Sequence, residues 1–179
     1  YVYVLNPDVV LKNDTILNLN NSISKLENFA ILSPLSDNPL YPNYRSNSGE
    51  IIKDNSKSII NVEEIDGYSM IINKDCFDDN IFFDEKFFMY LENVDLCFRV
   101  KKNAWKLYII TNSKIHHLGA KAVDDKYSEE IELSRNWHWM WSKFYFNKKY
   151  RGFFVSTLLG FISLLGNFVK YSFLSLIHI

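Results

Sequence analysis

Residues 87–99 read Phe-Phe-Met-Tyr-Leu-Glu-Asn-Val-Asp-Leu-Cys-Phe-Arg and place two carboxylates inside an otherwise apolar run. Glu92 and Asp95 stand three residues apart, so in a helix their side chains share one face. Burying charge among large apolar side chains is costly unless the charge has a partner or a task. One interpretation is structural, with both carboxylates on the wet edge of a helix and Asp95 paired to Arg99. The other is a functional site, and motifs elsewhere in the chain bear on that choice.

The pattern around this stretch predicts alternating strands and helices. Lys101 and Lys102 suit the C-terminal end of a helix at about 90–102, and Asn103 can adopt the left-handed conformation that ends it. Pro34 is expected to stop a strand that begins at Ala30. The expected elements are strands at 1–5, 30–33, 62–73 and 105–110 and helices at 14–26, 90–102 and 127–147, with a long loop at 36–58. This order predicts an α/β layered domain. In the helix at 14–26 the apolar side chains Ile16, Leu17, Leu19 and Ile23 are expected on the inner face.

Composition narrows the class of protein. The chain has 179 residues, of which 47% are hydrophobic and 23% charged, values typical of a globular domain with its own core. The net charge of −1 gives no general attraction for nucleic acid. Cys76 and Cys97 lack the spacing of a metal site and suit reduced, buried cysteines in a cytosolic protein.

Both ends of the chain raise expectations of their own. The stretch 1–5 is apolar enough to predict a buried strand of a parallel sheet, which needs a neighbour on each side. We therefore expect an N-terminal truncation. Residues 174–179 resemble a non-native tail, and they are left out of the reasoning about the fold.

Two short motifs stand next to predicted strands. Asn6-Pro7-Asp8 follows the first strand, and the pair His116-His117 follows the strand at 105–110. Ligands of open α/β sheets bind beyond the carboxyl ends of strands. A carboxylate there suits Mg²⁺ or Mn²⁺, and a neutral imidazole suits Mn²⁺. Each motif alone is also common in turns, but together they predict that Asp8 and His116 converge on one cation site.

The motifs also form an ordered series. Asn-Pro-Asp at 6–8, Asp-Gly at 66–67, Asp-Glu-x-Phe-Phe-Met-Tyr-x-Glu-x-x-Asp-Leu-Cys-x-Arg at 84–99 and His-His-Leu-Gly-x-Lys at 116–121 resemble the family 2 glycosyltransferases of the rhamnosyltransferase-like branch. The resemblance covers residues 1–122 and implies the C-terminal portion of a GT-A, Rossmann-like catalytic domain. It further implies an inverting enzyme with a nucleotide-sugar donor. The family's nucleotide pocket would lie upstream of Tyr1, so the chain by itself is expected to be inactive.

The resemblance assigns binding roles residue by residue. Asp8 and His116 would hold a divalent metal, Mg²⁺ or Mn²⁺, that bridges the donor diphosphate. Lys121 would add a positive charge near phosphate. Asp66 and Gly67 match the segment that lines the donor and acceptor sugars. The implied partners are a nucleotide-sugar donor and a glycan or lipid-linked acceptor, with no nucleic acid.

The catalytic assignment departs from the family at one position. The family usually has Glu-Asp where this chain has Glu92-Asn93, and the second residue commonly takes the proton of the acceptor hydroxyl. An amide cannot act as a base, so either Glu92 or Asp95 takes the role or the copy is impaired. We assign Glu92 as the base and Asp95 as its support. Arg99 would orient Asp95 and contribute to substrate binding.

The C-terminal third predicts an amphipathic aromatic helix at 123–152 and a hydrophobic segment at 153–173. Basic residues interleave with aromatic ones at the junction: Lys143, Lys148, Lys149 and Arg151. Such clusters suit a membrane interface, and a buried core helix is the alternative. The first interpretation adds a membrane surface as a partner and places the protein in the cytoplasm, at the inner face of the cell membrane.

Three functions are therefore weighed. The first is an inverting glycosyltransferase that moves a sugar, such as a deoxyhexose, to a cell-surface glycan or lipid-linked acceptor. The alternative is a catalytically silent, membrane-peripheral domain that binds a glycan or a partner, with Asn93 marking lost chemistry. The third is a metal-dependent phosphotransferase using Asp8 and His116, for which no activated Ser or Cys stands near the motifs.

Overall fold

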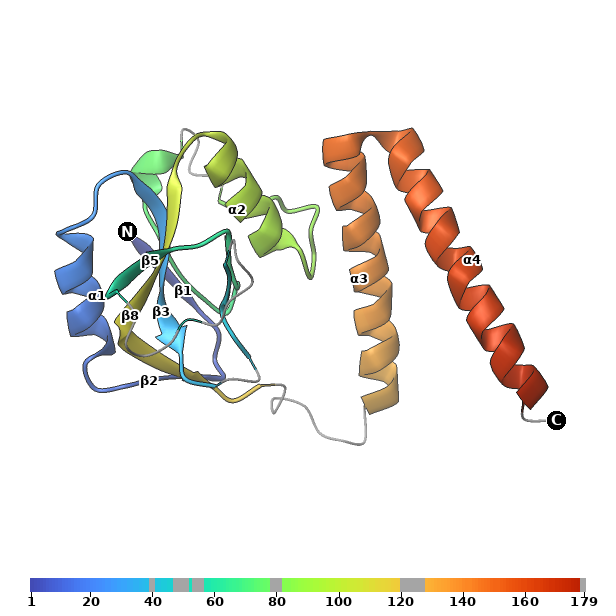
Figure 1. Cartoon of the computed structure of the whole chain (residues 1–179), viewed down its shortest axis with the longest axis horizontal. Coiled ribbons are helices and arrows are strands. Elements are labelled where there is room, and N and C mark those ends of the chain that lie inside the picture. Colours follow the sequence, from blue (N-terminus) through green and yellow to red (C-terminus); the bar gives the residue numbers. More distant parts are fainter. Residues whose placement is uncertain (39–40, 47–51, 53–56, 78–81, 120–127, 178–179) are drawn as a thin grey trace. The chain divides into compact units, whose positions relative to one another are not determined.

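A computed structural model of the chain describes residues 1–38, 41–46, 52, 57–77, 82–119 and 128–177. The chain forms two compact units. The first comprises Tyr1–Lys86 and Glu92–Glu129, and the second comprises Phe87–Leu91 and Glu130–Ile179. The first unit contains a sheet and helices, and the described part of the second is helical outside residues 87–91 (Figure 1). The predicted α/β class is confirmed at this level.

The main sheet of the first unit is mixed. Its order is β1 (Val2–Leu5), β7 (Ser69–Ile72), β3 (Phe29–Ser36), β8 (Lys106–His117) and β2 (Val9–Leu11), with β5 (Ile59–Asn61) also paired to β8. Strands β3 and β8 run parallel, and the other pairings are antiparallel. A second, two-stranded sheet joins β4 (Tyr44–Arg45) to β6 (Glu64–Ile65). One 3-10 turn, η1, covers Lys74–Cys76.

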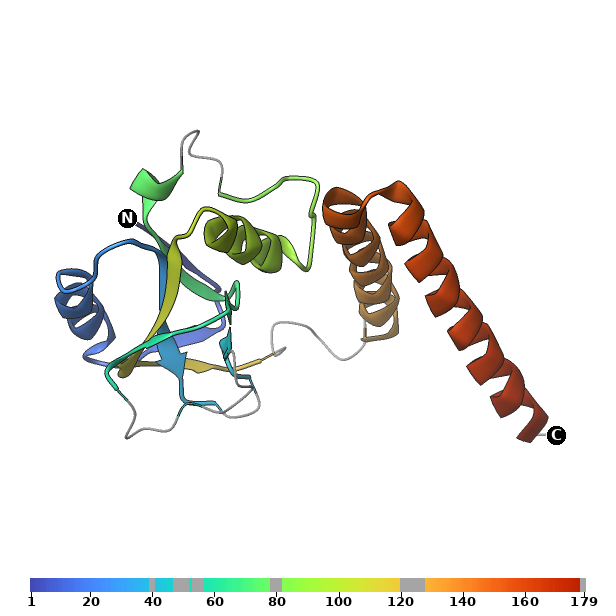
Figure 2. The ribbon, with the colours of Figure 1, turned by 45° about the horizontal axis from the view of Figure 1, so that its top comes forward.

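Successive residues of the central strands serve two cores, because side chains alternate between the faces of a sheet. On β8, Ile109 belongs to the core that contains Leu96 and Val100 of α2 (Glu92–Lys102). The next residue, Ile110, belongs to the core that contains Leu19 of α1 (Thr15–Ile23). The two helices thus cover opposite faces of the sheet (Figure 2).

Three expectations about strands are corrected. Strand β1 pairs antiparallel with β7 and lies at the edge of the sheet among the described residues, with half-buried or exposed side chains, rather than inside a parallel sheet. Pro34 does not stop β3, which continues to Ser36 across a shift in register beside that proline. Strand β8 extends to His117, so the two histidines belong to the strand instead of following it.

The helices differ from expectation at their faces and ends. Leu19 is buried in α1, whereas Ile16 and Leu17 are 52% and 60% exposed, because the helix packs through Thr15, Leu19 and Ser22 instead. Helix α2 begins at Glu92. After it, the left-handed conformation is adopted by Ala104 (φ 61°) and not by Asn103.

The second unit contains α3 (Ser128–Arg151) and α4 (Phe153–Ile177), which meet at Gly152 with φ 87°. None of the helices in the described part of the chain is long and apolar enough to cross a membrane. The two alternatives for residues 153–173, a membrane-associated segment and a buried helix, both stay predictions. The exposed apolar side chains of α4 are Phe153, Phe154, Val155, Leu158, Leu159, Phe161, Ile162, Leu164, Leu165, Phe168 and Val169.

Candidate functional site

Asp8 and His117 meet where β2 pairs with the end of β8. Val9 lies opposite His117 in this antiparallel pair, and the Leu118 amide donates to the Asp8 carbonyl at 3.0 Å. Asp8 Oδ2 then lies 3.0 Å from His117 Nε2. The two side chains are only 19% and 12% exposed. A carboxylate and an imidazole are thus held together by the backbone of two strands.

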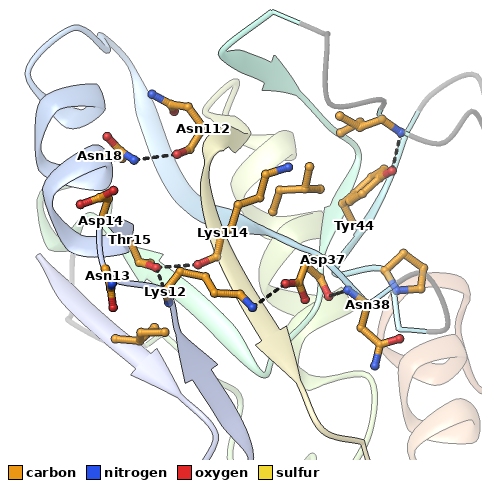
Figure 3. A pocket seen from close by; sticks show the side chains of 15 residues that line it. Lys12, Asn13, Asp14, Thr15, Asn18, Asp37, Asn38, Tyr44, Asn112 and Lys114 are labelled. Atoms are coloured by element: carbon orange, nitrogen blue, oxygen red, sulfur yellow. Dashed lines mark hydrogen bonds and ion pairs between the residues drawn. The ribbon is translucent and has the colours of Figure 1, made fainter.

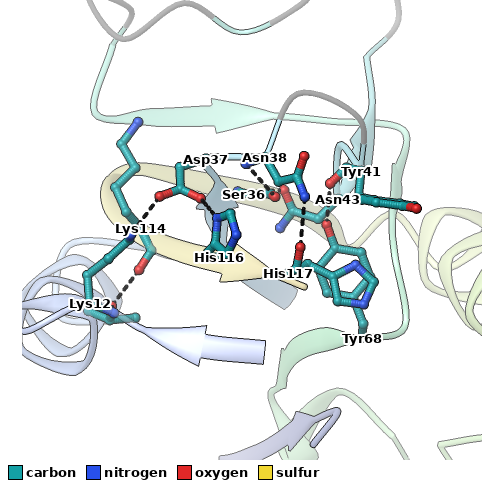
Figure 4. Close-up of polar contacts among 11 residues, drawn as sticks. Lys12, Ser36, Asp37, Asn38, Tyr41, Asn43, Tyr68, Lys114, His116 and His117 are labelled. Carbon is teal, nitrogen blue, oxygen red and sulfur yellow. Dashed lines mark hydrogen bonds and ion pairs between the residues drawn. The ribbon is translucent and has the colours of Figure 1, made fainter. Parts of the chain in front are cut away.

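The neighbouring histidine points elsewhere, because adjacent residues of a strand face opposite sides of the sheet. His116 Nδ1 lies 2.6 Å from Asp37 Oδ1, and Lys12 Nζ lies 2.8 Å from the other oxygen of Asp37 (Figure 4). Burial acts to raise the pKa of Asp37, but its bonds to Lys12 and His116 outweigh burial and leave the pKa below its usual value. The structure therefore joins Asp8 to His117, and the expected convergence of Asp8 with His116 is wrong.

Two tyrosines hold the His117 ring. The Tyr68 ring stacks on it with centroids 4.0 Å apart, and Tyr41 meets it edge-on at 5.4 Å. The Tyr68 hydroxyl donates to the Tyr41 carbonyl at 2.6 Å, and burial raises the pKa of this hydroxyl. Gly119 has φ 63°, and a Cβ there would lie 2.4 Å from the Tyr41 ring. Only a glycine therefore fits at position 119, beside the Tyr41 ring.

The Asp66-Gly67 turn is attached to the same place. The Asp66 amide donates to the Asn43 carbonyl at 2.9 Å, and the Asn6 amide donates to the Tyr68 carbonyl at 3.0 Å. Asn43 is fully buried and bonds β3 through its side chain. The segments around Asp8 and Asp66 are thus linked through backbone hydrogen bonds.

Gly67 faces the start of α2. A Cβ at Gly67 would lie 3.4 Å from Asn93 Cβ and 3.6 Å from Glu92 Oε1. Asn93 Nδ2 donates to the Ile65 carbonyl at 3.1 Å and lies 3.4 Å from Asp66 Oδ1. Gly67 therefore lies close to the helix that carries Glu92, while its expected place beside the donor and acceptor sugars stays a prediction.

Glu92 and Asp95 have different surroundings. Glu92 Oε2 is buried and accepts no hydrogen bond from the described residues. Asp95 is fully buried, and its Oδ2 accepts from Arg99 Nε at 2.9 Å. Arg99 also donates to the Phe82 carbonyl. The expected pairing of Asp95 with Arg99 is confirmed, while the substrate-binding role of Arg99 stays a prediction.

Asp66 connects these groups electrostatically. Burial raises its pKa, and the negative charge of Glu92 adds to the rise. The Gly67 amide and His117 act in the opposite direction without cancelling it. Asp66 thus interacts electrostatically with both His117 and Glu92, and His117 contacts Asp8, so groups from four separate segments meet in one region. A buried carboxyl with a raised pKa, such as Asp66, marks functional sites more often than chance.

The cluster contains one pair suited to a divalent cation. A carboxylate with an imidazole fits the preferences of Mn²⁺, and Asp8 and His117 supply both. No group of three or more metal-ligating side chains occurs among the described residues. A cation held here would therefore take most of its ligands from substrate oxygens or water, as Mg²⁺ and Mn²⁺ commonly do in diphosphate sites. Lys121 lies outside the described residues.

A separate cavity of about 740 Å³ lies beside α1 and the ends of β2, β3 and β8 (Figure 3). Its polar groups largely bind one another, since Asn18 Nδ2 donates to the Asn112 carbonyl at 2.7 Å and Thr15 Oγ1 to the Lys114 carbonyl at 2.5 Å. It contains none of the clustered carboxylates. We therefore place the candidate site at Asp8, Asp66, Glu92 and His117 and not in this cavity.

Sequence reasoning missed His117, Tyr68 and Asn43. His117 was visible as half of a pair, and the phase of the strand decides between its two members. No local sequence pattern marks Tyr68 or Asn43, because each acts through a distant partner. Tyr68 stacks on His117, 49 residues away, and Asn43 donates to Ser33 of β3, 10 residues away. No protein-family model and no curated protein matches this chain.

Asp66→Asn is expected to stabilise the protein at neutral pH. Because the folded-state pKa of Asp66 is raised, its charge opposes folding once the pH exceeds the value of an unfolded aspartate. The gain in Tm should be present at pH 7 and should vanish as the pH falls below 3.8, the ordinary aspartate value. Thermal unfolding from pH 3 to 8 with a chelator present measures it.

Asp14→Asn is the matched control, since Asp14 is exposed at the start of α1 and asparagine caps helices as well as aspartate. A loss of stability in Asp66→Asn at pH 7 would contradict the electrostatic account.

Proposed function

We propose that this protein is an inverting glycosyltransferase with a GT-A catalytic domain, similar to family 2 enzymes of the rhamnosyltransferase-like branch. It transfers a sugar from a nucleotide-diphosphate donor to a cell-surface glycan or lipid-linked acceptor. One observation supports this above all: the motif residues Asp8, Asp66 and Glu92, far apart in sequence, cluster with His117 at one place. These are the segments that the resemblance assigns to metal, sugar and base.

In this proposal Asp8 and His117 hold Mg²⁺ or Mn²⁺ together with the donor diphosphate. A metal held there would supply positive charge against the charge that develops on the leaving nucleotide diphosphate. Asp66 accepts a hydrogen bond from a sugar hydroxyl, and Gly67 lets the chain approach the start of α2 closely. The raised pKa of Asp66 reflects the burial that such a contact requires.

Glu92 is the general base. Its Oε2 atom accepts no hydrogen bond from the described residues, and this unmet capacity supports its assignment to the proton of the acceptor hydroxyl. Asp95 is bound to Arg99 and serves to hold α2. Asn93 donates to the Ile65 carbonyl and keeps the turn at Asp66 in place. The base role therefore falls on the one carboxylate of α2 that lacks a partner of its own among the described residues.

His117→Gln is expected to weaken Mn²⁺ binding by at least about tenfold, in line with the loss caused by disturbing a metal's ligands. His116→Gln, one residue away, is the matched control and should leave binding near the wild-type value. Electron paramagnetic resonance of Mn²⁺, with inorganic pyrophosphate standing in for the donor diphosphate, measures both. Equal losses in the two variants would contradict the assignment of His117.

In the full-length protein, Glu92→Gln is expected to lower kcat by about 10²–10⁴, the usual contribution of a general base. Donor binding should stay near normal, because Asp8 and His117 are unchanged. Asn93→Asp should be neutral or activating. Asp95→Asn should reduce stability more than it reduces the chemical step, since it breaks a buried ion pair.

Single-turnover transfer and donor titration measure these effects. Full activity in Glu92→Gln with loss in Asp95→Asn would reverse the two roles. A full-length protein that binds glycan and never transfers or hydrolyses a donor sugar would instead favour the catalytically silent alternative.

We also infer that the second unit binds the anionic inner face of the cell membrane. Four exposed basic residues lie near the end of α3: Lys143, Lys148, Lys149 and Arg151. They adjoin α4, whose large apolar side chains from Phe153 to Val169 are exposed. Basic residues attract anionic headgroups, and an apolar helix face inserts into the interface without spanning it.

The full-length protein is expected to sediment with vesicles containing phosphatidylglycerol and much less with phosphatidylcholine alone. Replacing Lys143, Lys148 and Arg151 by glutamine should weaken binding by about 1 kcal/mol for each charge. High salt should have the same effect on the wild-type protein. Binding that ignores both headgroup charge and salt would contradict the proposal.

A charge-matched control replaces three exposed lysines of the first unit by glutamine, Lys25, Lys74 and Lys106. This variant should bind anionic vesicles as the wild-type protein does.

A further inference from the structure

The five residues that precede Glu92 do not cluster with the sheet. Phe87–Leu91 belongs to the second unit, although Lys86 and Glu92 on either side belong to the first. The segment lies on α3 through ring contacts whose centroids are 4.8 to 5.7 Å apart. The pairs are Phe87 with Tyr145, Phe88 with His138 and Tyr90 with Trp139. The segment that contacts α3 therefore ends at the residue before the candidate base.

Ser142 makes a hydrogen bond between α3 and residues 87–91. Its hydroxyl donates to the main-chain carbonyl of Met89 at 2.6 Å, and the residue is fully buried. A serine inside a helix commonly bonds a carbonyl of its own preceding turn. Here the hydroxyl bonds the neighbouring segment instead, so the bond fixes the position of that segment's backbone against α3.

The backbone between Met89 and α2 is strained. Tyr90 and Leu91 have φ values of 68° and 64°, the left-handed region that residues other than glycine rarely adopt. In this region the Cβ of such a residue comes too close to the backbone, which makes the conformation strained. Two in succession do not persist unless their surroundings hold them, and strain of this kind gathers at functional sites. The contacts of residues 87–90 with α3 are the surroundings that the structure provides.

We propose that α3 positions the Glu92 carboxylate by holding this left-handed pair, with Ser142 as the positioning residue. The inference rests on the proposed function, in which Glu92 is the base. The direction of the chain at residue 92 follows from the two preceding residues. When the pair relaxes, the first turn of α2 shifts and the carboxylate leaves its place beside Gly67.

The expected effect is confined to the chemical step. A displacement of about 1 Å at a reacting group can lower a rate by about 10²-fold. Asp8 and His117 belong to β2, β8 and their neighbouring turn, so metal and donor binding do not depend on residues 87–91. Loss of kcat with unchanged donor affinity is therefore the signature of this positioning.

The test replaces Ser142 by alanine in the full-length protein. Ser134→Ala is the matched control, because Ser134 lies on the same helix and is exposed. Ser142→Ala is expected to lower kcat by about tenfold to hundredfold at unchanged donor KM, and Ser134→Ala to do neither. Hydrogen exchange should also become faster at amides 90–93 and stay unchanged at amides 97–100, a readout that needs no activity.

A second pair of variants acts on the strain without touching α3. Leu91→Val should lower kcat in the same way, since a β-branched residue disfavours the left-handed region more than leucine does. Leu91→Gly should partly restore kcat in the Ser142→Ala protein, because glycine adopts that region without penalty. If Ser142→Ala unfolds the protein, Leu91→Val alone decides the proposal.

The outcomes separate the two inferences. Full activity in Glu92→Gln overturns the base assignment, whatever Ser142→Ala does. Loss of activity in Glu92→Gln, with Ser142→Ala and Leu91→Val both matching the Ser134→Ala control in kcat and in hydrogen exchange, overturns the positioning role alone.

Discussion

Hydrogen bonding along both edges of β8 holds the first unit together. Strand β3 runs parallel along one edge, while β5 and β2 pair with other parts of the same strand. Its buried residues alternate between the two cores, so both helices pack on it. Strand β2 pairs with the last three residues of β8, and this pairing places His117 next to Asp8. The cores and the candidate site therefore share one structural support.

A second constraint fixes α2 on that support. Asp95 is fully buried and its partner Arg99 is 28% exposed, so loss of the guanidinium would leave a buried carboxylate without this ion pair. Asn93 ties the first turn of the helix to the Ile65 carbonyl. These contacts leave Glu92 as the carboxylate at the start of the helix, next to Gly67. The expected pairing of Asp95 with Arg99 is present, but Asp95 is fully buried and does not lie on the wet edge of the helix. The functional role of Glu92 stays a prediction.

The sequence predicted what depends on local spacing. The helix near 90–102 and the i+4 pairing of Asp95 with Arg99 follow from neighbouring residues, and the structure contains them. It could not choose between His116 and His117, because that choice depends on the phase of β8 against β2. The predicted inner face of α1 is wrong for a similar reason, because packing against the sheet decides that Leu19 is buried and Leu17 is exposed. Pro34 is accommodated by a register shift that only the paired strand reveals.

The contact between Asp8 and His117 joins residues 109 positions apart and has a consequence for folding. Contacts between distant parts of a chain form late, because closing a long loop costs entropy before any pairing compensates it. On the ribosome, Asp8 and Asp66 emerge well before the residues of β8. The nascent chain therefore passes through a stage in which the acidic residues are present without their imidazole partner. Local unfolding at the end of β8 would likewise separate Asp8 from His117 in the mature protein.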